Sequence, residues 1–269
     1  MNSSVQNIIK GAVDFHVHAS PSIKEEQMDV LEVARAAYEF ELGGFVYKSE
    51  DHPTAALASI LKQMYPGLKI IGSLVLNDSI GGINPSAIEI SARLGAKVVW
   101  IPPLKPRLYP EKQCVLFTND GSLSKESLNA LEIIGSHEMT LVSCLTSLPE
   151  TITLFNESKR RGVKRMVANN AHGTMSIEDQ REIASHGAYL EYTFLSCMPS
   201  HAKINPKKMT RDIQSVGIDK CIVATGFGQW LNPPPAEGLR MAIAALLDSG
   251  LSEQQVSILV KENPKSLVD

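Results

Sequence analysis

The chain of 269 residues has few cysteines, little excess charge of either sign and no long hydrophobic run. Its 4 cysteines are scattered without a CxxC pair, which argues against a disulfide scaffold or a zinc ribbon and favours a reducing compartment. Lysine and arginine number 26 against 29 acidic residues, with no long basic run, so we expect no nucleic-acid partner. No stretch resembles a membrane span or the apolar core of a signal peptide. The sequence therefore predicts a cytoplasmic protein without a membrane partner.

What the sequence does contain is a regular alternation of two kinds of segment. Segments with apolar residues three and four positions apart, typical of amphipathic helices, alternate with short β-branched runs, typical of buried strands. The expected strands are 12–18, 44–48, 69–77, 96–102, 139–145, 163–169, 188–194 and 220–225. This pattern favours an α/β fold, a single (β/α)8 TIM barrel that forms one domain over residues 1–269. A doubly wound open sheet is the alternative.

The connection after the fourth expected strand is unusually long. It runs from Pro102 to about Ser124 and contains the tight-turn signal 119–121, which predicts a small hairpin. In a barrel this connection lies on the face that carries the active site, where long loops often form lids. A purely structural flap is the alternative. Arg107 in this loop is a candidate partner for a substrate carboxylate, although a solvated loop arginine explains it as well.

The first expected strand ends in the motif His16-Val17-His18. Residues i and i+2 of a strand point to the same face, so we expect the two imidazoles to project together. Phe15 and Val17 are then expected to pack on the other face. Two aligned imidazoles suit one zinc or iron ion, while two unrelated histidines are the alternative for so short a motif.

Polar side chains also follow the ends of the other expected strands. In a barrel these positions meet at the carboxyl-terminal rim, where the βα loops surround the active site. The polar residues at this rim are Lys48, Glu50, His52, Asn77, Cys144, Asn170, His172, Glu191 and the turn 225–229. Each has an ordinary structural explanation by itself, but together they predict a polar site that includes both histidines of the motif.

Several longer motifs resemble those of the amidohydrolase superfamily of metal-dependent hydrolases, most closely a little-characterised amidohydrolase-like branch. They are DFHVHASPS, KSEDHPTAA, LVLNDSIGGINPSAIE, GAKVVWIPP and GFGQWLNPPPAEGLR, and the resemblance runs over nearly the whole chain. It implies a TIM barrel with a divalent metal ion at its mouth, most often zinc, with manganese or iron as alternatives. It also implies a hydrolase that attacks a C–N or C–O bond of a small molecule with a metal-activated water.

The chain departs from the family pattern at four positions. Glu50, Cys144 and Asn170 stand where the family pattern leads us to expect histidines. Gly226 stands where it leads us to expect an aspartate, at the end of strand eight. The missing aspartate matters most, because in the family it ligates metal and takes a proton from the attacking water. If Gly226 marks a lost ligand, an aspartate should fit there without strain; a turn that requires glycine is the alternative.

The residues that match the family pattern, together with residues that could replace its missing ligands, define a predicted site. The predicted metal ligands are His16, His18, Cys144 and His172. The predicted catalytic residues are Lys48, as a bridging carbamate or as an ammonium that stabilises an anionic intermediate, and Glu50, as the replacement carboxylate. The predicted substrate-binding residues are Asn77, Arg107, Asn170, Glu191, Gln229 and Asn232.

Two other functions stay open at this point. A lyase, decarboxylase or isomerase on the same barrel needs no hydrolytic aspartate, and a single metal or Lys48 would then act as the electrophile. A binding protein that has lost its metal is the second alternative, because four ligand positions are substituted. The identity of the small-molecule substrate does not follow from the sequence, and a homo-oligomer is compatible with it.

Overall fold

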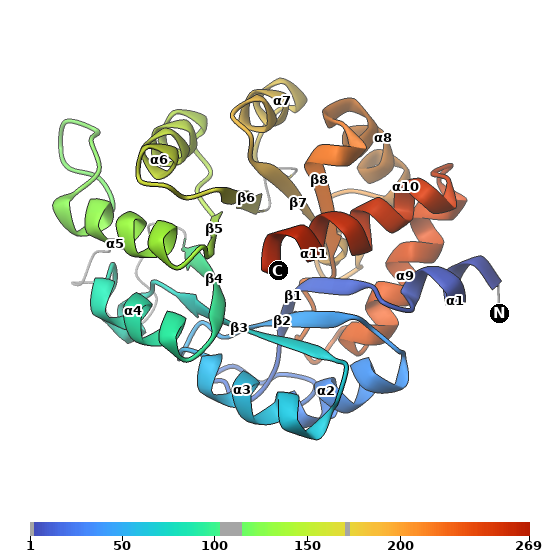
Figure 1. The fold of residues 1–269 in the computed structure, drawn as a ribbon. Helices are drawn as coiled ribbons and strands as arrows, with labels where there is room; N and C mark the ends of the chain where they lie inside the picture. The colour runs from blue at the N-terminus through green and yellow to red at the C-terminus, as the bar shows by residue number, and fades with distance from the viewer. Residues whose placement is uncertain (1–2, 103–114, 170–172) are drawn as a thin grey trace.

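The computed structural model describes residues 3–102, 115–169 and 173–269, and its centre is one eight-stranded sheet (Figure 1). Each strand pairs in parallel with the next one along the chain, from β1 to β8. The strands are β1 Val13–His18, β2 Gly44–Lys48, β3 Lys69–Val75, β4 Ala96–Ile101, β5 Thr140–Ser143, β6 Arg165–Asn169, β7 Tyr189–Thr193 and β8 Cys221–Ala224. The predicted (β/α)8 barrel is therefore confirmed.

The residues after β8 join the last strand to the first. The Gly226 N–H donates to the His16 carbonyl over 2.9 Å, and the His18 N–H donates to the Phe227 carbonyl over 2.8 Å. Val17 and Phe227 form a parallel bridge at the same place. This seam between β1 and the β8 turn completes the barrel and fixes the backbone of both histidines.

A helix follows each strand and lies outside the barrel (Figure 1). These helices are α2 Val30–Glu39, α3 Ala55–Met64, α4 Pro85–Arg93, α5 Lys125–Ser136, α6 Leu148–Arg160, α7 Ile177–Ser185, α8 Pro206–Val216 and α9 Pro235–Asp248. α1 Ser3–Ile9 precedes β1, while α10 Glu253–Ser257, a π-helical turn Ile258–Glu262 and α11 Asn263–Val268 end the chain. Within the described ranges, we find no helix that is both long and apolar enough to cross a membrane.

Side-chain caps explain where several of these helices begin. Asp29 and Ser176 each form a capping box, in which the side chain accepts the N–H of the third helical residue and that residue's side chain accepts in return. Asn84 caps α4, and Pro85 follows it at the first position, where a missing N–H costs nothing. The local sequence therefore sets the start of these helices.

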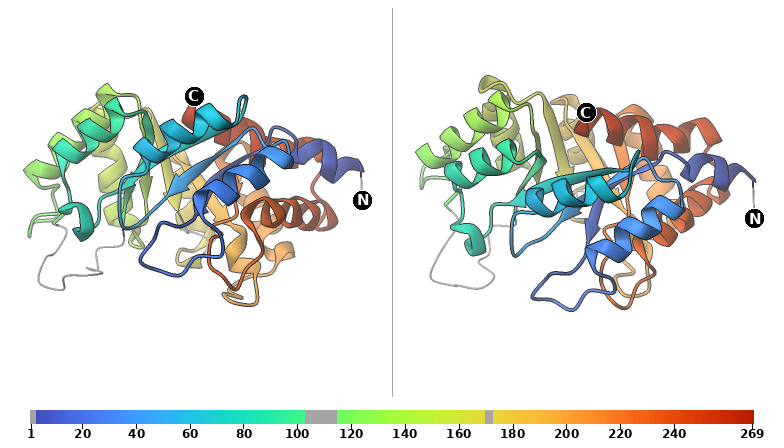
Figure 2. Two further views of the ribbon diagram at one scale, coloured as in Figure 1. Left: turned by 90° about the horizontal axis from the view of Figure 1, so that it is seen from below. Right: turned by 60° about the horizontal axis from the view of Figure 1, so that its bottom comes forward.

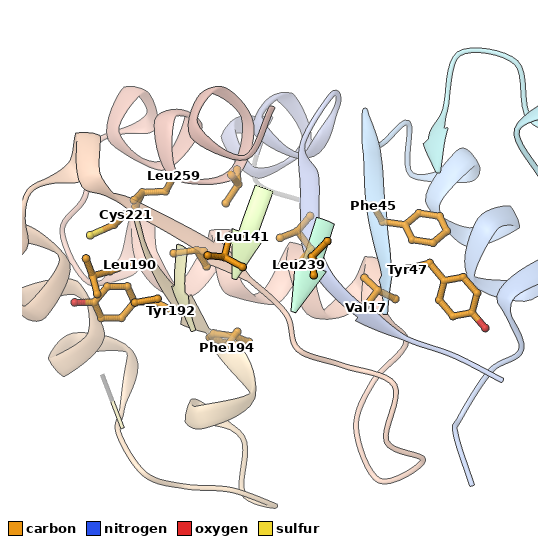
Figure 3. Packing of buried hydrophobic residues seen from close by; sticks show 14 of the residues in the cluster. Val17, Phe45, Tyr47, Leu141, Leu190, Tyr192, Phe194, Cys221, Leu239 and Leu259 are labelled. Atoms are coloured by element: carbon orange, nitrogen blue, oxygen red, sulfur yellow. The ribbon is translucent and has the colours of Figure 1, made fainter. Parts of the chain in front are cut away.

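Two apolar clusters hold the barrel together. The larger one lies between the strands and the surrounding helices, and Figure 3 shows part of it, including Tyr47, Leu141 and Leu190 on strands and Leu239 on α9. The smaller cluster fills the inside of the barrel and includes Trp100 of β4. Side chains alternate between these two clusters along the regular strands, for example Phe45, Val46 and Tyr47 of β2, as the period of two requires.

α11 closes one end of the barrel. Its Leu267 and Val268 belong to the inner cluster, and the Thr140 hydroxyl at the start of β5 donates to the Leu267 carbonyl. Lys69 at the start of β3 pairs with Asp269. In Figure 2 the C-terminus accordingly lies opposite the loop that follows β1. The open mouth is thus at the carboxyl-terminal ends of the strands.

β1 differs from the expected strand at Phe15, and most of the connection after β4 is not described. Phe15 was expected on the face opposite His16, but it belongs to the inner cluster and its ring centroid lies 6.0 Å from that of Trp100. The register of β1 shifts between Asp14 and Val17, and this irregularity turns Phe15 inward as well as His16. Residues 103–114 of the long connection after β4 lie outside the described residues. Its last part holds a turn at Gly121, closed by an antiparallel bridge between Phe117 and Leu123.

Candidate active site

A pocket of about 230 Å³ lies at the carboxyl-terminal mouth of the barrel. Side chains from the ends of three strands and from the turn after β8 line it, among them His16, His18, Lys48, Glu50, Thr193 and Gly226. Another hollow of about 420 Å³ lies outside the barrel between α1, α2 and α9. Its two cations are each paired with a carboxylate, Lys10 with Glu41 and Arg240 with Glu237. The chemistry-bearing residues are therefore gathered at the mouth.

His16 and His18 lie side by side in this pocket. Their Nε2 atoms are 3.1 Å apart, and their ring centroids are 5.0 Å apart. His16 is almost fully buried and also lies against Trp100, with 4.8 Å between the two ring centroids. The two imidazoles therefore present one nitrogen each to the same point.

A buried carboxylate holds the far side of the His16 ring. Glu191 of β7 has no exposed surface, and its Oε1 lies 2.7 Å from His16 Nδ1. The Asn169 side chain donates from Nδ2 to Glu191 Oε2 over 2.6 Å. A carboxylate only accepts hydrogen bonds, so His16 Nδ1 carries the proton and donates it to Glu191. The lone pair of the ring is then on Nε2, which faces the pocket.

The surroundings keep His16 uncharged. Burial, followed by the positive charge of Lys48, lowers the pKa of His16 well below its usual range. A neutral imidazole keeps its lone pair on Nε2, where it accepts a hydrogen bond at neutral pH. The site therefore has a preformed acceptor at its centre.

Lys48 of β2 is the nearest charged group to that acceptor. Its Nζ lies 3.3 Å from His16 Nε2 and 4.5 Å from the centroid of the Trp100 ring. The side chain is 6% exposed, and in the described ranges no carboxylate forms an ion pair with it. The indole face stabilises the ammonium in part, because a ring quadrupole attracts a cation.

Asp14 and Thr225 form a second buried contact just below the histidines. Asp14 Oδ1 accepts the N–H of Thr225 over 3.0 Å, and Oδ2 accepts the Thr225 hydroxyl over 2.6 Å. Burial raises the pKa of Asp14 to about 7 despite these hydrogen bonds. The contact ties the irregular part of β1 to the end of β8 and so positions the backbone of His16.

Four other predicted site residues lie on the loops around the mouth. Glu50 lines the pocket, with its carboxylate 3.7 Å from Lys24 Nζ. The Asn77 amide donates to the Glu50 carbonyl over 3.0 Å. Gln229 donates to the Gly226 carbonyl and accepts from the Asn232 amide. The described contacts of Asn77, Gln229 and Asn232 therefore stabilise the loops. Glu50 lies at the rim of the pocket.

Cys144 lies just beyond β5, within electrostatic reach of Lys48, Glu191 and Glu50. Burial raises the pKa of its thiol to about 11. The thiolate, which is the form that binds metal, is therefore disfavoured at neutral pH. The predicted residues Arg107, Asn170 and His172 lie outside the described residues.

The donor atoms that the structure describes do not make a complete metal site. Catalytic zinc usually has three protein ligands, whereas no group of three His, Cys, Asp or Glu side chains that could hold a metal is found in the ranges described. His16 and His18 supply two nitrogens that suit one ion. The third polar group at the same point is the Lys48 ammonium, which repels a divalent cation. With Lys48 charged, this set of residues does not fit a divalent metal.

Gly226 stands where the family resemblance would place an aspartate, and its backbone conformation favours glycine. Its φ is +68°, a left-handed conformation that side-chain-bearing residues adopt at a cost. A Cβ added there would lie 3.2 Å from both Cβ and Cγ2 of Thr193. The expectation that an aspartate fits at this position without strain is therefore wrong.

Several residues at the site were missed by reasoning from the sequence. They are Asn169, Trp100, Asp14 and Thr225. The period of two along each strand could have found the first two, because Val167 and Asn169 share the inner face, as do Val98 and Trp100. Attention to strand ends selected Asn170 instead, one position too far for the inner face of β6. The contact between Asp14 and Thr225 depends on the irregular register of β1, which has no sequence signature.

Comparison with known proteins gives one family and several structures. A family of unknown function, DUF6282, matches residues 11–191. No curated protein matches the chain. An amidohydrolase from Pseudomonas aeruginosa has a similar structure, with a TM-score of 0.69 and 13% identity over 99% of this chain and 97% of that one. A variant of organophosphorus hydrolase from Deinococcus radiodurans has a TM-score of 0.63 and 12% identity over 96% and 93% of the two chains. The fold predicted from the amidohydrolase resemblance is thus confirmed.

Proposed function

This chain belongs to DUF6282, a family of unknown function, so its activity has to be argued from the site, and we propose that it is a hydrolase. The substrate is a small molecule with a carbonyl-linked C–N or C–O bond. The reaction takes place in the pocket at the carboxyl-terminal mouth of the barrel. The pocket volume of about 230 Å³ is below the roughly 300–1,000 Å³ of sites for drug-sized ligands, which supports a small substrate.

The observation that carries the proposal is the buried hydrogen bond between His16 and Glu191. The carboxylate fixes the imidazole with Nδ1 protonated, so that Nε2 faces the pocket and can accept a proton. A histidine held by a carboxylate in this way serves as a general base in hydrolytic sites on unrelated folds. The similar structures include an amidohydrolase and an organophosphorus hydrolase, which supports the same reaction class.

The proposed reaction begins with a water molecule next to His16 Nε2. His16 takes a proton from this water as the water attacks the scissile carbonyl, and Glu191 stabilises the imidazolium that forms. Asn169 donates to the other oxygen of Glu191 and keeps the carboxylate from turning away. His16 then returns the proton to the departing nitrogen or oxygen. This sequence uses only residues of the chain, and no step depends on a metal ion.

A screen of small esters, lactones and amides, followed by kinetics of three variants, tests the proposal. The His16→Asn variant removes the base, and we expect kcat/KM to fall by about 10²–10⁴. Glu191→Gln should lower kcat by a smaller factor with little change in KM, because it leaves the base but removes its orienting charge. His137→Gln is the control, since His137 follows α5 and pairs with Glu89 away from the mouth.

Hydrolysis that survives in His16→Asn at the wild-type rate would contradict the proposal. So would an equal loss in His16→Asn and His137→Gln, because that pattern reports a general loss of structure. Circular dichroism of each variant shows whether the fold is intact.

A further inference from the structure

The position of Lys48 is unusual for a cation. It is almost fully buried, its ammonium lies 3.3 Å from His16 Nε2, and it forms no ion pair with a carboxylate in the ranges the structure describes. A buried charge is stable only when another charge or several polar groups compensate for it. The Trp100 ring supplies part of this compensation. Glu191, behind the His16 ring, and Glu50, which lines the same pocket, add compensation at longer range, and a negatively charged ligand at Nζ would add a direct partner.

The same position conflicts with a divalent cation. A zinc ion bound to an imidazole nitrogen lies about 2.1 Å from that nitrogen, so an ion on His16 Nε2 would lie within about 5.4 Å of Lys48 Nζ. The ammonium and a doubly charged ion at such a separation repel each other strongly, even with the screening that is typical near a protein surface. Lys48 therefore weakens any metal site that His16 and His18 could form.

We infer that the Lys48 ammonium is the resident positive charge of this site, and that the pocket takes a small carboxylate-bearing substrate whose anionic oxygen binds at Nζ. This inference rests on the proposed function for the nature of the reaction and adds the substrate class. A carboxylate fits better than a phosphate, because one buried ammonium balances one negative charge. Among the described residues that line the pocket, the other lysine is Lys24, which is at the rim and already pairs with Glu50.

Ser49 adds a second donor beside Lys48. It is buried, lines the pocket, and its Oγ accepts the N–H of Asp51 over 3.2 Å. In the ranges described, no group accepts the proton of this hydroxyl. Lys48 and Ser49 thus give the same pocket one charged donor and one neutral donor.

Zinc binding tests whether the Lys48 ammonium is the resident positive charge of the site. Lys48→Met keeps the length and volume of the side chain but removes the charge, so we expect zinc to bind at least tenfold more tightly than to the wild type. The measurement is a titration of chelator-treated protein with Zn²⁺ alone against a chromophoric chelator. Lys48→Met/His16→Ala should lose the gain, which shows that the extra affinity comes from the histidines. Lys24→Met is the control, and it should bind zinc as the wild type does.

Acetate binding tests whether the pocket takes a carboxylate at Lys48 Nζ. The chain has 2 tryptophans, so a Trp230→Phe background leaves Trp100, whose ring contacts Lys48, as the fluorescent reporter. We expect a saturable change in Trp100 fluorescence with sodium acetate at constant ionic strength. Lys48→Met should abolish this change, and Lys24→Met should retain it. Sodium phosphate should give a weaker response than acetate.

The opposite results would overturn the inference. If Lys48→Met binds zinc no more tightly than the wild type, or loses zinc that the wild type holds, Lys48 is not a competing cation. If acetate changes Trp100 fluorescence equally in Lys48→Met, or not at all in the wild type, Lys48 binds no anion. Lys48→Gln repeats both measurements if Lys48→Met does not fold. Neither assay measures hydrolysis, so an inactive protein that passes both tests would contradict the proposed function alone.

Discussion

Substitution of Gly226 tests how the seam between β8 and β1 depends on a residue without a side chain. Its N–H donates to the His16 carbonyl at the seam between β8 and β1, and its φ of +68° favours glycine. We predict that Gly226→Ala destabilises the protein through two separate effects. One is the cost of a left-handed backbone with a side chain, and the other is the contact of the new Cβ with Thr193.

The size of each effect follows from the structure. A left-handed conformation costs a residue with a side chain about 1–2 kcal/mol. The added Cβ would lie 3.2 Å from two carbon atoms of Thr193, and such overpacking of a filled site costs about 1–3 kcal/mol more. Gly95→Ala is the matched control, because Gly95 has a φ of +93° and no atom within 4 Å of an added Cβ. The control should therefore show the first cost alone.

Urea denaturation of the wild type and both variants measures the difference. We expect Gly95→Ala to lower the free energy of unfolding by about 1–2 kcal/mol and Gly226→Ala by about 2–5 kcal/mol. Adding Thr193→Ala to Gly226→Ala removes the Cγ2 contact and should recover part of the excess. Equal losses for the two glycine variants would refute the contact argument, and no loss for either would refute the backbone argument.

The same position decides whether the glycine stands in for a lost metal ligand. Gly226→Asp must adopt the same φ and make the same contact with Thr193, so we expect it to be destabilised like Gly226→Ala. It should also bind zinc no more tightly than the wild type, because its carboxylate starts from a strained backbone. Tighter zinc binding with unchanged stability would restore the interpretation of Gly226 as a vacated ligand position.

Two further predictions concern stability. Thr225→Val removes the hydroxyl that donates to Asp14 and should cost about 1.5–3 kcal/mol by urea denaturation, whereas Thr151→Val, whose hydroxyl bonds only within its own helix, should cost less. An equal cost would contradict the role of the Asp14 contact. Burial raises the pKa of Cys221 above its usual 9.0, so the folded state keeps a proton that the unfolded state loses above that pH. Stability should therefore fall above pH 9 by up to about 1.4 kcal/mol per pH unit, and Cys221→Ala should reduce this slope; an unchanged slope in the variant would contradict it.

The fold could be predicted from the sequence because it depends on repeated local patterns. Eight β-branched runs, each followed by a segment of helical period, leave few ways to bury both kinds of apolar face in one sheet. Caps such as Asn84 and Ser176 mark helix starts in the sequence itself. The inward turn of Phe15 could not be predicted in this way, since it follows from a register shift that depends on pairing with a strand distant in sequence.

The site could be predicted only in part. The end of a strand predicts that a residue lies near the mouth of the barrel, but it does not predict whether the side chain points inward. The i, i+2 pattern brings His16 and His18 together, and Lys48 and Glu191 also lie at the inner face. Asn169 occupies the inner position of β6, one residue before the asparagine selected at the strand end. Counting by two from a core residue is therefore a better guide to such a site than the last residue of each strand.

The chemistry of a histidine pair depends on the charge of its neighbours more than on the pair itself. With a carboxylate facing both Nε2 atoms, His16 and His18 would form the start of a metal site. Here the group that faces His16 Nε2 is the Lys48 ammonium, and the buried carboxylate of Glu191 lies on the other side of the ring. This order of charges, carboxylate to imidazole to ammonium, orients a neutral base toward a cation. Such an arrangement suits the attack of water on a substrate whose negative charge rests on Lys48, and it explains why the same motif need not bind metal.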